Sequence, residues 1–186
     1  MADTDEPTEW HDDDIRRLYR DLPYPPEFTR AFGEVMIEFA SLERDLFDAT
    51  ADIATNDFVH AAILLAGIPY SGLVDRFCAL GLHLSSGKRD IDQEINRLRL
   101  KLLDVSERRN HLIHFAWLLE PISGSISRIR TSAKGKSGLR FDTPIVPTSE
   151  LTDLKRDIIS VRSGTNTLAA KFVNRLPPEP HAPPAV

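Results

Sequence analysis

The feature that most constrains the fold is a repeated spacing of apolar residues along the chain. From residue 28 to residue 53, apolar side chains follow one another at alternating steps of four and three. The same steps recur in residues 91–105 and, with one threonine among the apolar residues, in 151–172. This spacing gathers side chains on one stripe of an α-helix. It therefore predicts three long amphipathic helices.

A further helical region is predicted over residues 57–84. Asp57 is a suitable N-cap, Pro69 fits the first turn of a restarted helix, and Gly87 marks the end. With short connections between them, these segments predict an all-α fold, an antiparallel bundle of four to five helices.

The segment from residue 115 to residue 146 has a different pattern. Three short strand-like runs are separated there by the glycine-containing turns SGS and KGKSG, which predicts a small β-hairpin insertion. We thus expect a helical domain over 27–175, preceded by a loose acidic segment (1–26) and followed by a proline-rich disordered tail (176–186).

Composition narrows the class of protein. Cys78 is the single cysteine, which excludes an internal disulfide and a zinc site built from several cysteines. The first residues are acidic, unlike the basic start of a signal peptide, and no run of about 20 apolar residues is long enough to span a bilayer. These features predict a cytoplasmic protein without a membrane segment.

Charge is unevenly distributed along the chain. Residues 1–60 hold 16 acidic and 5 basic side chains, whereas residues 87–140 hold 6 acidic and 12 basic ones. A local excess of positive charge attracts phosphate even when the whole chain is acidic. The second segment is therefore the candidate for a surface that attracts phosphate groups.

Arg109 breaks the apolar pattern of its helix, because it occupies a stripe position. A guanidinium buried without a partner is strongly unfavourable, so Arg109 needs a carboxylate, a water-filled cleft or a bound anion. Pairing with Glu43 or Glu107 would give it a purely structural role, and His114 would then only cap the helix end. Both interpretations are compatible with the sequence.

The run from Arg109 through Asn110 to His114 resembles the signature of the HEPN domains (higher eukaryotes and prokaryotes nucleotide-binding). That signature is an arginine, a polar residue and a histidine, with four to six residues separating the two charged positions. The likeness extends to the helical architecture of about residues 27–175. It implies a homodimer that brings two copies of the motif together and, in many members, RNA cleavage without a metal ion or other cofactor.

In such a reaction the resemblance assigns Arg109 to the phosphate, His114 to proton transfer, and Asn110 to orienting the histidine or binding phosphate. Substrate contacts are expected from Arg108, His111, Arg128 and Arg130, and Glu43 would brace Arg109. A toxin, defence or stress-response setting with an antitoxin partner is one expectation. Some toxin members carry a tyrosine two residues after the histidine, where this chain has Ala116, so adenylylation there is not expected. The alternative is a non-catalytic helical module that binds a partner protein or a nucleotide.

Overall fold

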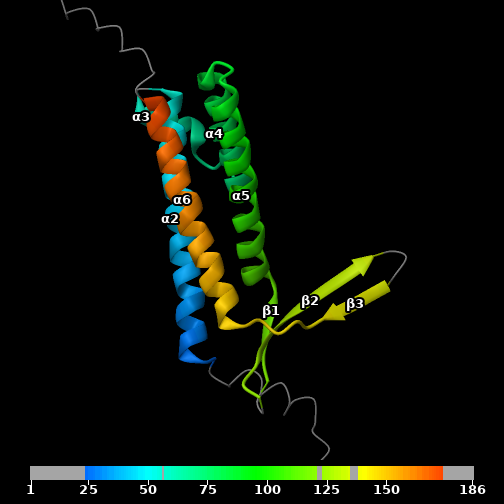
Figure 1. The fold of residues 1–186 in the computed structure, drawn as a ribbon. Helices are drawn as coiled ribbons and strands as arrows, with labels where there is room; N and C mark the ends of the chain where they lie inside the picture. The colour runs from blue at the N-terminus through cyan, green and yellow to red at the C-terminus, as the bar shows by residue number, and fades with distance from the viewer. Residues whose placement is uncertain (1–23, 56, 121–122, 135–137, 174–186) are drawn as a thin grey trace, which may run out of the picture.

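The computed structural model describes residues 24–55, 57–120, 123–134 and 138–173. The elements in these residues are helices α2 (Pro26–Ala54), α3 (Phe58–Leu65), α4 (Tyr70–Ser85), α5 (Arg89–His114) and α6 (Thr148–Val173), and strands β1 (Ala116–Leu119), β2 (Ile126–Lys134) and β3 (Gly138–Asp142). Figure 1 shows a bundle of long helices with the sheet at one end. The predicted all-helical bundle with a small β insertion is confirmed.

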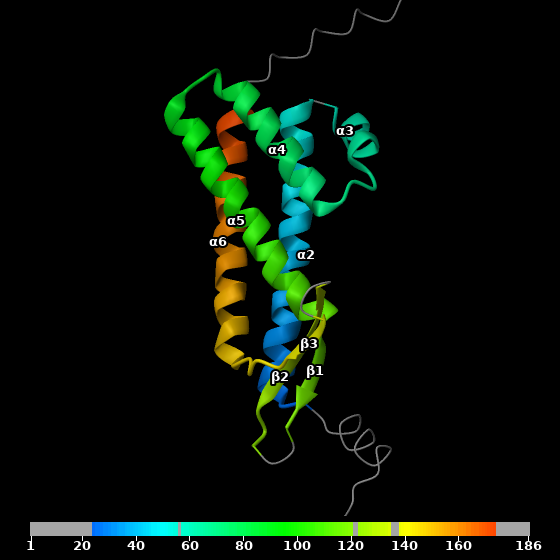
Figure 2. The same ribbon diagram turned by 90° about the vertical axis from the view of Figure 1, so that its right-hand side faces the viewer.

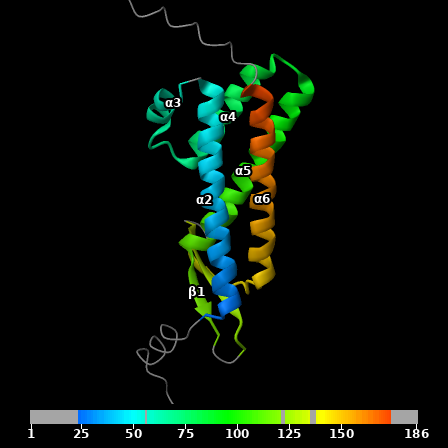
Figure 3. The same cartoon turned by 90° about the vertical axis from the view of Figure 1, so that its left-hand side faces the viewer.

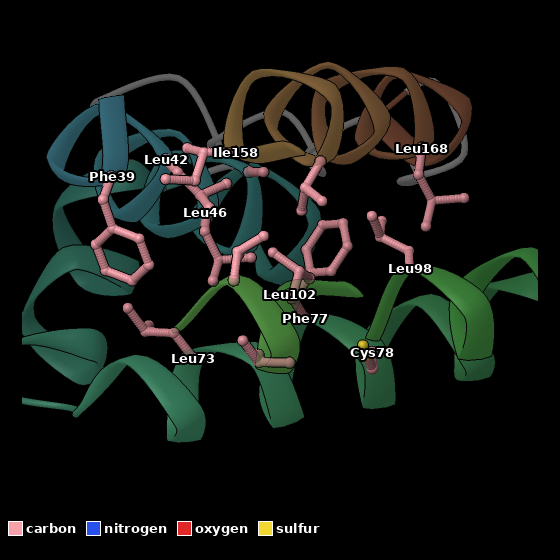
Figure 4. Close-up of a cluster of buried hydrophobic side chains, with 14 of the residues drawn as sticks. Phe39, Leu42, Leu46, Leu73, Phe77, Cys78, Leu98, Leu102, Ile158 and Leu168 are labelled. Carbon is pink, nitrogen blue, oxygen red and sulfur yellow. The ribbon is translucent and has the colours of Figure 1, made fainter. Parts of the chain in front are cut away.

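The predicted apolar stripes form the core of the bundle. The side chains that face inward come from α2, α4, α5 and α6, and Figure 4 shows them converging on one interior. The fully buried members include Phe39, Leu42, Leu46, Phe77, Leu102 and Ile158. Cys78 is buried among them, as a small apolar residue would be.

The local signals between residues 57 and 87 act within one residue of the predicted positions; Pro69 lies just before the restarted helix, whereas the sequence predicts it in the first turn. The Asp57 carboxylate accepts a hydrogen bond from the backbone N–H of His60 and caps α3. Pro69 immediately precedes α4, and Gly87 follows it with a positive φ of 75°. That left-handed conformation favours glycine, which explains why the chain reverses here into α5.

The helices do not all alternate in direction. α5 runs antiparallel to α4, but α2 and α6 run in the same direction, as Figures 1 and 3 show. Ion pairs along this parallel contact join Glu34 to Lys155 and Asp45 to Arg162, at 2.9 and 2.7 Å. α5 ends at the end of the bundle at which α2 begins, and the β insertion leaves the chain at that same end, so α6 starts there and runs in the direction of α2.

The insertion contains one more strand than a single hairpin. Its three antiparallel strands are ordered β1-β2-β3, and Leu119 pairs with Ile126 next to the turn between β1 and β2. Trp117 on β1 fixes the sheet to the bundle. Its ring packs on Phe28, and its indole N–H donates to the carbonyl of Leu112 at 2.9 Å. The distal part of β2 and β3 projects away from the helices (Figure 1).

Residues 1–23 and 174–186, where the sequence predicts a loose segment and a disordered tail, lie outside the described residues. Within the described residues, every helix is too short or too polar to cross a membrane.

Candidate functional site

Arg109 lies near the end of α5, on the side that faces α2. Its neighbours on the same stripe, Val105 and Leu112, are each 1% exposed, whereas Arg109 is half-buried. The guanidinium carbon stands 4.6 Å from the centre of the Phe39 ring, a cation–π contact. The charged head is therefore held at the edge of the core, against an aromatic face.

Arg109 has few polar partners. One terminal nitrogen donates to the side-chain oxygen of Asn110 at 3.1 Å, and the buried Nε has no hydrogen-bond partner among the residues that the structure describes. Among the described side chains, no carboxylate forms an ion pair with Arg109. A half-buried cation without an anion is a costly arrangement that a bound anion would relieve.

The Phe39 ring that contacts the Arg109 guanidinium is itself held in place by a second aromatic ring. Phe39, 1% exposed, packs against Tyr70 with ring centres 5.0 Å apart. The Tyr70 hydroxyl donates to the carbonyl of Leu102 at 3.2 Å, which ties α4 to α5. Burial, and secondarily the charge of Glu43, raise the pKa of the Tyr70 hydroxyl, so it remains a neutral donor.

Glu43 does not take the bracing position that the sequence predicts for it. It is half-buried on α2, where its charge acts on Tyr70, and no ion pair joins it to Arg109. Glu107 is the other candidate, and its carboxylate oxygen Oε1 lies 3.9 Å from Nε2 of His111. The two carboxylates proposed to neutralise Arg109 therefore leave it unpaired.

The three motif residues are only partly brought together. α5 is helical through His114, and the backbone becomes extended at Phe115. Five residues of helix separate Arg109 from His114 by about 7.5 Å in height and about 140° around the axis. Asn110 contacts Arg109 and shares the face of His114, four residues further on.

His114 and His111 differ in their surroundings. His114 is exposed at the last helical position, where its ring is open to solvent. The His111 ring packs against Phe115 with centres 5.4 Å apart and is 36% exposed. His114 is thus the more accessible of the two histidines, whereas His111 is partly occupied in packing.

The arginines expected to contact substrate carry compensated charges. Arg108 donates to Asp157 at 2.6 Å and to Asp104 at 3.3 Å. Although partial burial acts in the opposite direction, these two carboxylates raise the pKa of Arg108. Arg128 donates to Glu150 at 3.0 Å. Arg108 and Arg128 thus join α5 and β2 to α6 through ion pairs that compensate their charge, and substrate contact by either arginine stays a prediction.

Glutamine at Arg108 or at Arg128 should therefore leave RNA cleavage nearly unchanged. Each substitution should lower the free energy of unfolding by at most about 1 kcal/mol, because both ion pairs are partly open to solvent. Urea unfolding and an RNA-cleavage assay check this. A loss of cleavage without a loss of stability would indicate that the substituted arginine contacts the RNA.

Arg130 is described only by its place in the sheet. It pairs with Asp142 on β3, and Ser132 pairs with Arg140 and Lys134 with Gly138. The side chain of Arg130 lies outside the described part of the structure, so substrate contact by this residue stays a prediction.

The sequence did not indicate the aromatic support of the site. Phe39 is recognisable as a core residue from its stripe, but its contact with Arg109 crosses 70 residues of chain. Nothing in the local sequence marks Tyr70 as its neighbour.

Within the described residues, no group of three His, Cys, Asp or Glu side chains is arranged to hold a metal ion. Comparisons with models of protein families, with curated proteins and with solved structures found no match.

Proposed function

We propose that this protein is a metal-independent endoribonuclease whose reaction depends on Arg109 and His114. The observation that supports it is the Arg109 guanidinium, half-buried on Phe39 and without a carboxylate partner among the described side chains. A guanidinium binds phosphate oxygens through a fork of N–H donors. A phosphate group is the anion whose binding would complete this arrangement.

The chemistry requires few groups. In cleavage by the ribose 2′-hydroxyl, a base removes the hydroxyl proton, the 2′-oxygen attacks phosphorus, and an acid protonates the departing 5′-oxygen. Histidine side chains exchange protons near neutral pH and serve in both roles. Arg109 would stabilise the extra negative charge of the phosphorane, and the Asn110 amide would hold the guanidinium in place.

The reaction needs two proton-transfer groups, a base and an acid, but the motif of each chain has one exposed histidine. In a homodimer, His114 of each copy would provide one of the two, as base and acid. The 140° separation of Arg109 and His114 around α5 favours this arrangement, because the two groups of a single chain point in different directions. An RNA strand would then lie across both copies.

The RNA backbone would lie along the projecting strands, whose sequence carries the basic residues Arg130, Lys134 and Arg140. A backbone held by basic residues binds with an affinity that falls steeply as salt is added.

RNA cleavage in the presence of EDTA tests the proposal. The full chain should cleave single-stranded RNA at an unchanged rate in excess chelator and leave 2′,3′-cyclic phosphate or 3′-phosphate ends, because no step requires a metal ion. End-group analysis by mass spectrometry identifies these products. Abolition of cleavage by EDTA, restored by Mg²⁺ or Mn²⁺, would contradict it.

The same unpaired guanidinium also suits a protein that binds a nucleotide phosphate without cleaving RNA. Binding of a nucleotide that depends on Arg109, in a chain that cleaves none of a varied set of RNAs, would favour this second function.

A further inference from the structure

The start of the described chain is fixed close to the candidate site. The hydroxyl of Tyr24 donates to the backbone carbonyl of Trp117 at 3.0 Å, and the Tyr24 ring packs on Phe28. Trp117 follows His114, the last residue of α5, by three positions. Figures 2 and 3 show the start of α2 beside β1. The sequence that precedes Tyr24 therefore joins the bundle at the end that carries Arg109 and His114.

That preceding sequence is rich in carboxylates. Residues 3–14, the acidic stretch, contain seven acidic residues and no lysine or arginine, and the basic residues of the first 23 all follow it, at positions 16, 17 and 20. Carboxylates pair with a guanidinium through its fork of N–H donors. The acidic stretch thus has the chemistry that Arg109 lacks, because no carboxylate among the described side chains forms an ion pair with this arginine.

The acidic stretch is also long enough to reach Arg109. Thirteen residues of α2 separate Pro26 from Phe39, whose ring contacts the guanidinium, and they rise by about 20 Å. The ten residues from Asp14 to Tyr24 span up to about 33 Å when fully extended. A tethered group that can reach its site acts at an effective concentration on the order of millimolar. Even a weak contact between these carboxylates and Arg109 would therefore be populated.

We propose that the acidic stretch occupies the Arg109 site when no RNA is bound, and that it inhibits the protein by competing with RNA phosphate. This inference rests on the proposed function, because it concerns the regulation of the same site. Carboxylate and phosphate are alternative anions for one guanidinium. The affinity for RNA is then reduced by the fraction of chains in which the site is free.

Binding of a 2′-O-methyl RNA oligonucleotide tests the proposal without cleavage, because the attacking hydroxyl of this probe is blocked. The full chain with Asp13→Asn/Asp14→Asn should bind the probe at least about threefold more tightly than the parent, since the site is free in a larger fraction of chains. Fluorescence anisotropy at one fixed, low salt concentration measures the two dissociation constants.

The matched control is Asp52→Asn/Asp90→Asn, near the end of α2 and at the start of α5. Both side chains are exposed, and both lie at the end of the bundle opposite the sheet, as Figure 1 shows for these helix ends. The control removes the same number of charges and should bind the probe like the parent. Equal tightening in the two double variants overturns the proposal, because total charge would then explain it.

Arg109→Met shows whether the effect passes through the guanidinium. In this background the acidic stretch has lost its partner, so adding Asp13→Asn/Asp14→Asn should no longer tighten binding of the probe. The same tightening with and without Arg109 overturns the proposal.

Thiol cross-linking locates the acidic stretch in the absence of RNA. Burial raises the pKa of Cys78 to about 11, so its thiol is unreactive at neutral pH. Ile113 is 40% exposed and lies four residues after Arg109, on the same face of α5. A short cross-linker should join the two cysteines of His11→Cys/Ile113→Cys, and the probe should prevent it. The control His11→Cys/Ile63→Cys, with its second cysteine on α3, should not be joined.

Equal cross-linking of the two pairs, or cross-linking of the first pair that the probe does not reduce, overturns the proposal. The outcomes also separate it from the proposed function. Cleavage that depends on Arg109, in a chain without the cross-link, would refute the inhibition alone. The cross-link in a chain that cleaves no RNA would support the contact and refute the ribonuclease alone.

Discussion

Replacing Arg109 with alanine should lower the rate of RNA cleavage by about 10²- to 10³-fold, the effect of removing one donor that stabilises a developing oxyanion. The loss should appear at saturating RNA, because the guanidinium acts most strongly on the extra charge of the phosphorane. Single-turnover cleavage of a defined RNA measures it. Full activity in a folded Arg109→Ala chain would exclude Arg109 from the reaction.

Substitution of Arg109 should also have an unusual effect on the free energy of unfolding. Removing the contact with Phe39 costs roughly 0.5–2 kcal/mol, but removing the buried Nε without a partner relieves roughly 1–3 kcal/mol. Arg109→Met, which keeps much of the side-chain volume, should therefore unfold at the same urea concentration as the parent or at a higher one. A structural arginine would give the opposite result, with lower stability and unchanged cleavage.

Replacing His114 with alanine should lower the cleavage rate by about 10²- to 10⁴-fold, because proton transfer by a positioned side chain contributes that much. The free energy of unfolding should change little, since the ring is exposed at the end of α5. His83→Ala, at an exposed histidine on α4, is the matched control and should keep full activity.

Mixing chains shows whether two copies share the chemistry. If the base and the acid are His114 of different copies, an equal mixture of parent and His114→Ala chains should retain about a quarter of the activity of the same total amount of parent, because only parent–parent dimers keep both groups. Each chain acting alone would leave about half.

The sequence predicted the helices well because their signals are local. The apolar stripe of residues 28–53, the Asp57 cap and the turn at Gly87 all act within a few residues of their own positions. The parallel course of α2 and α6 was not predictable in this way. It depends on the end of the bundle at which α5 leaves the chain, and on side chains more than 100 positions apart.

The same difference between local signals and long-range contacts applies to the candidate site. The exceptional position of Arg109 was visible in the sequence because it interrupts a stripe. Its support by Phe39 and Tyr70, and the neutralisation of Arg108 by Asp157, were not visible because they arise where separate helices meet. Which arginine remains unpaired among the described residues is decided by tertiary packing.

The pairing of α2 with α6 affects how the chain is made. The ion pairs between Asp45 and Arg162 and between Glu34 and Lys155 span 117 and 121 positions. During synthesis, the apolar face of α2 leaves the ribosome long before the helix that covers much of it. Completion of the bundle is therefore postponed until the last helix has emerged, and contacts of such long range slow folding.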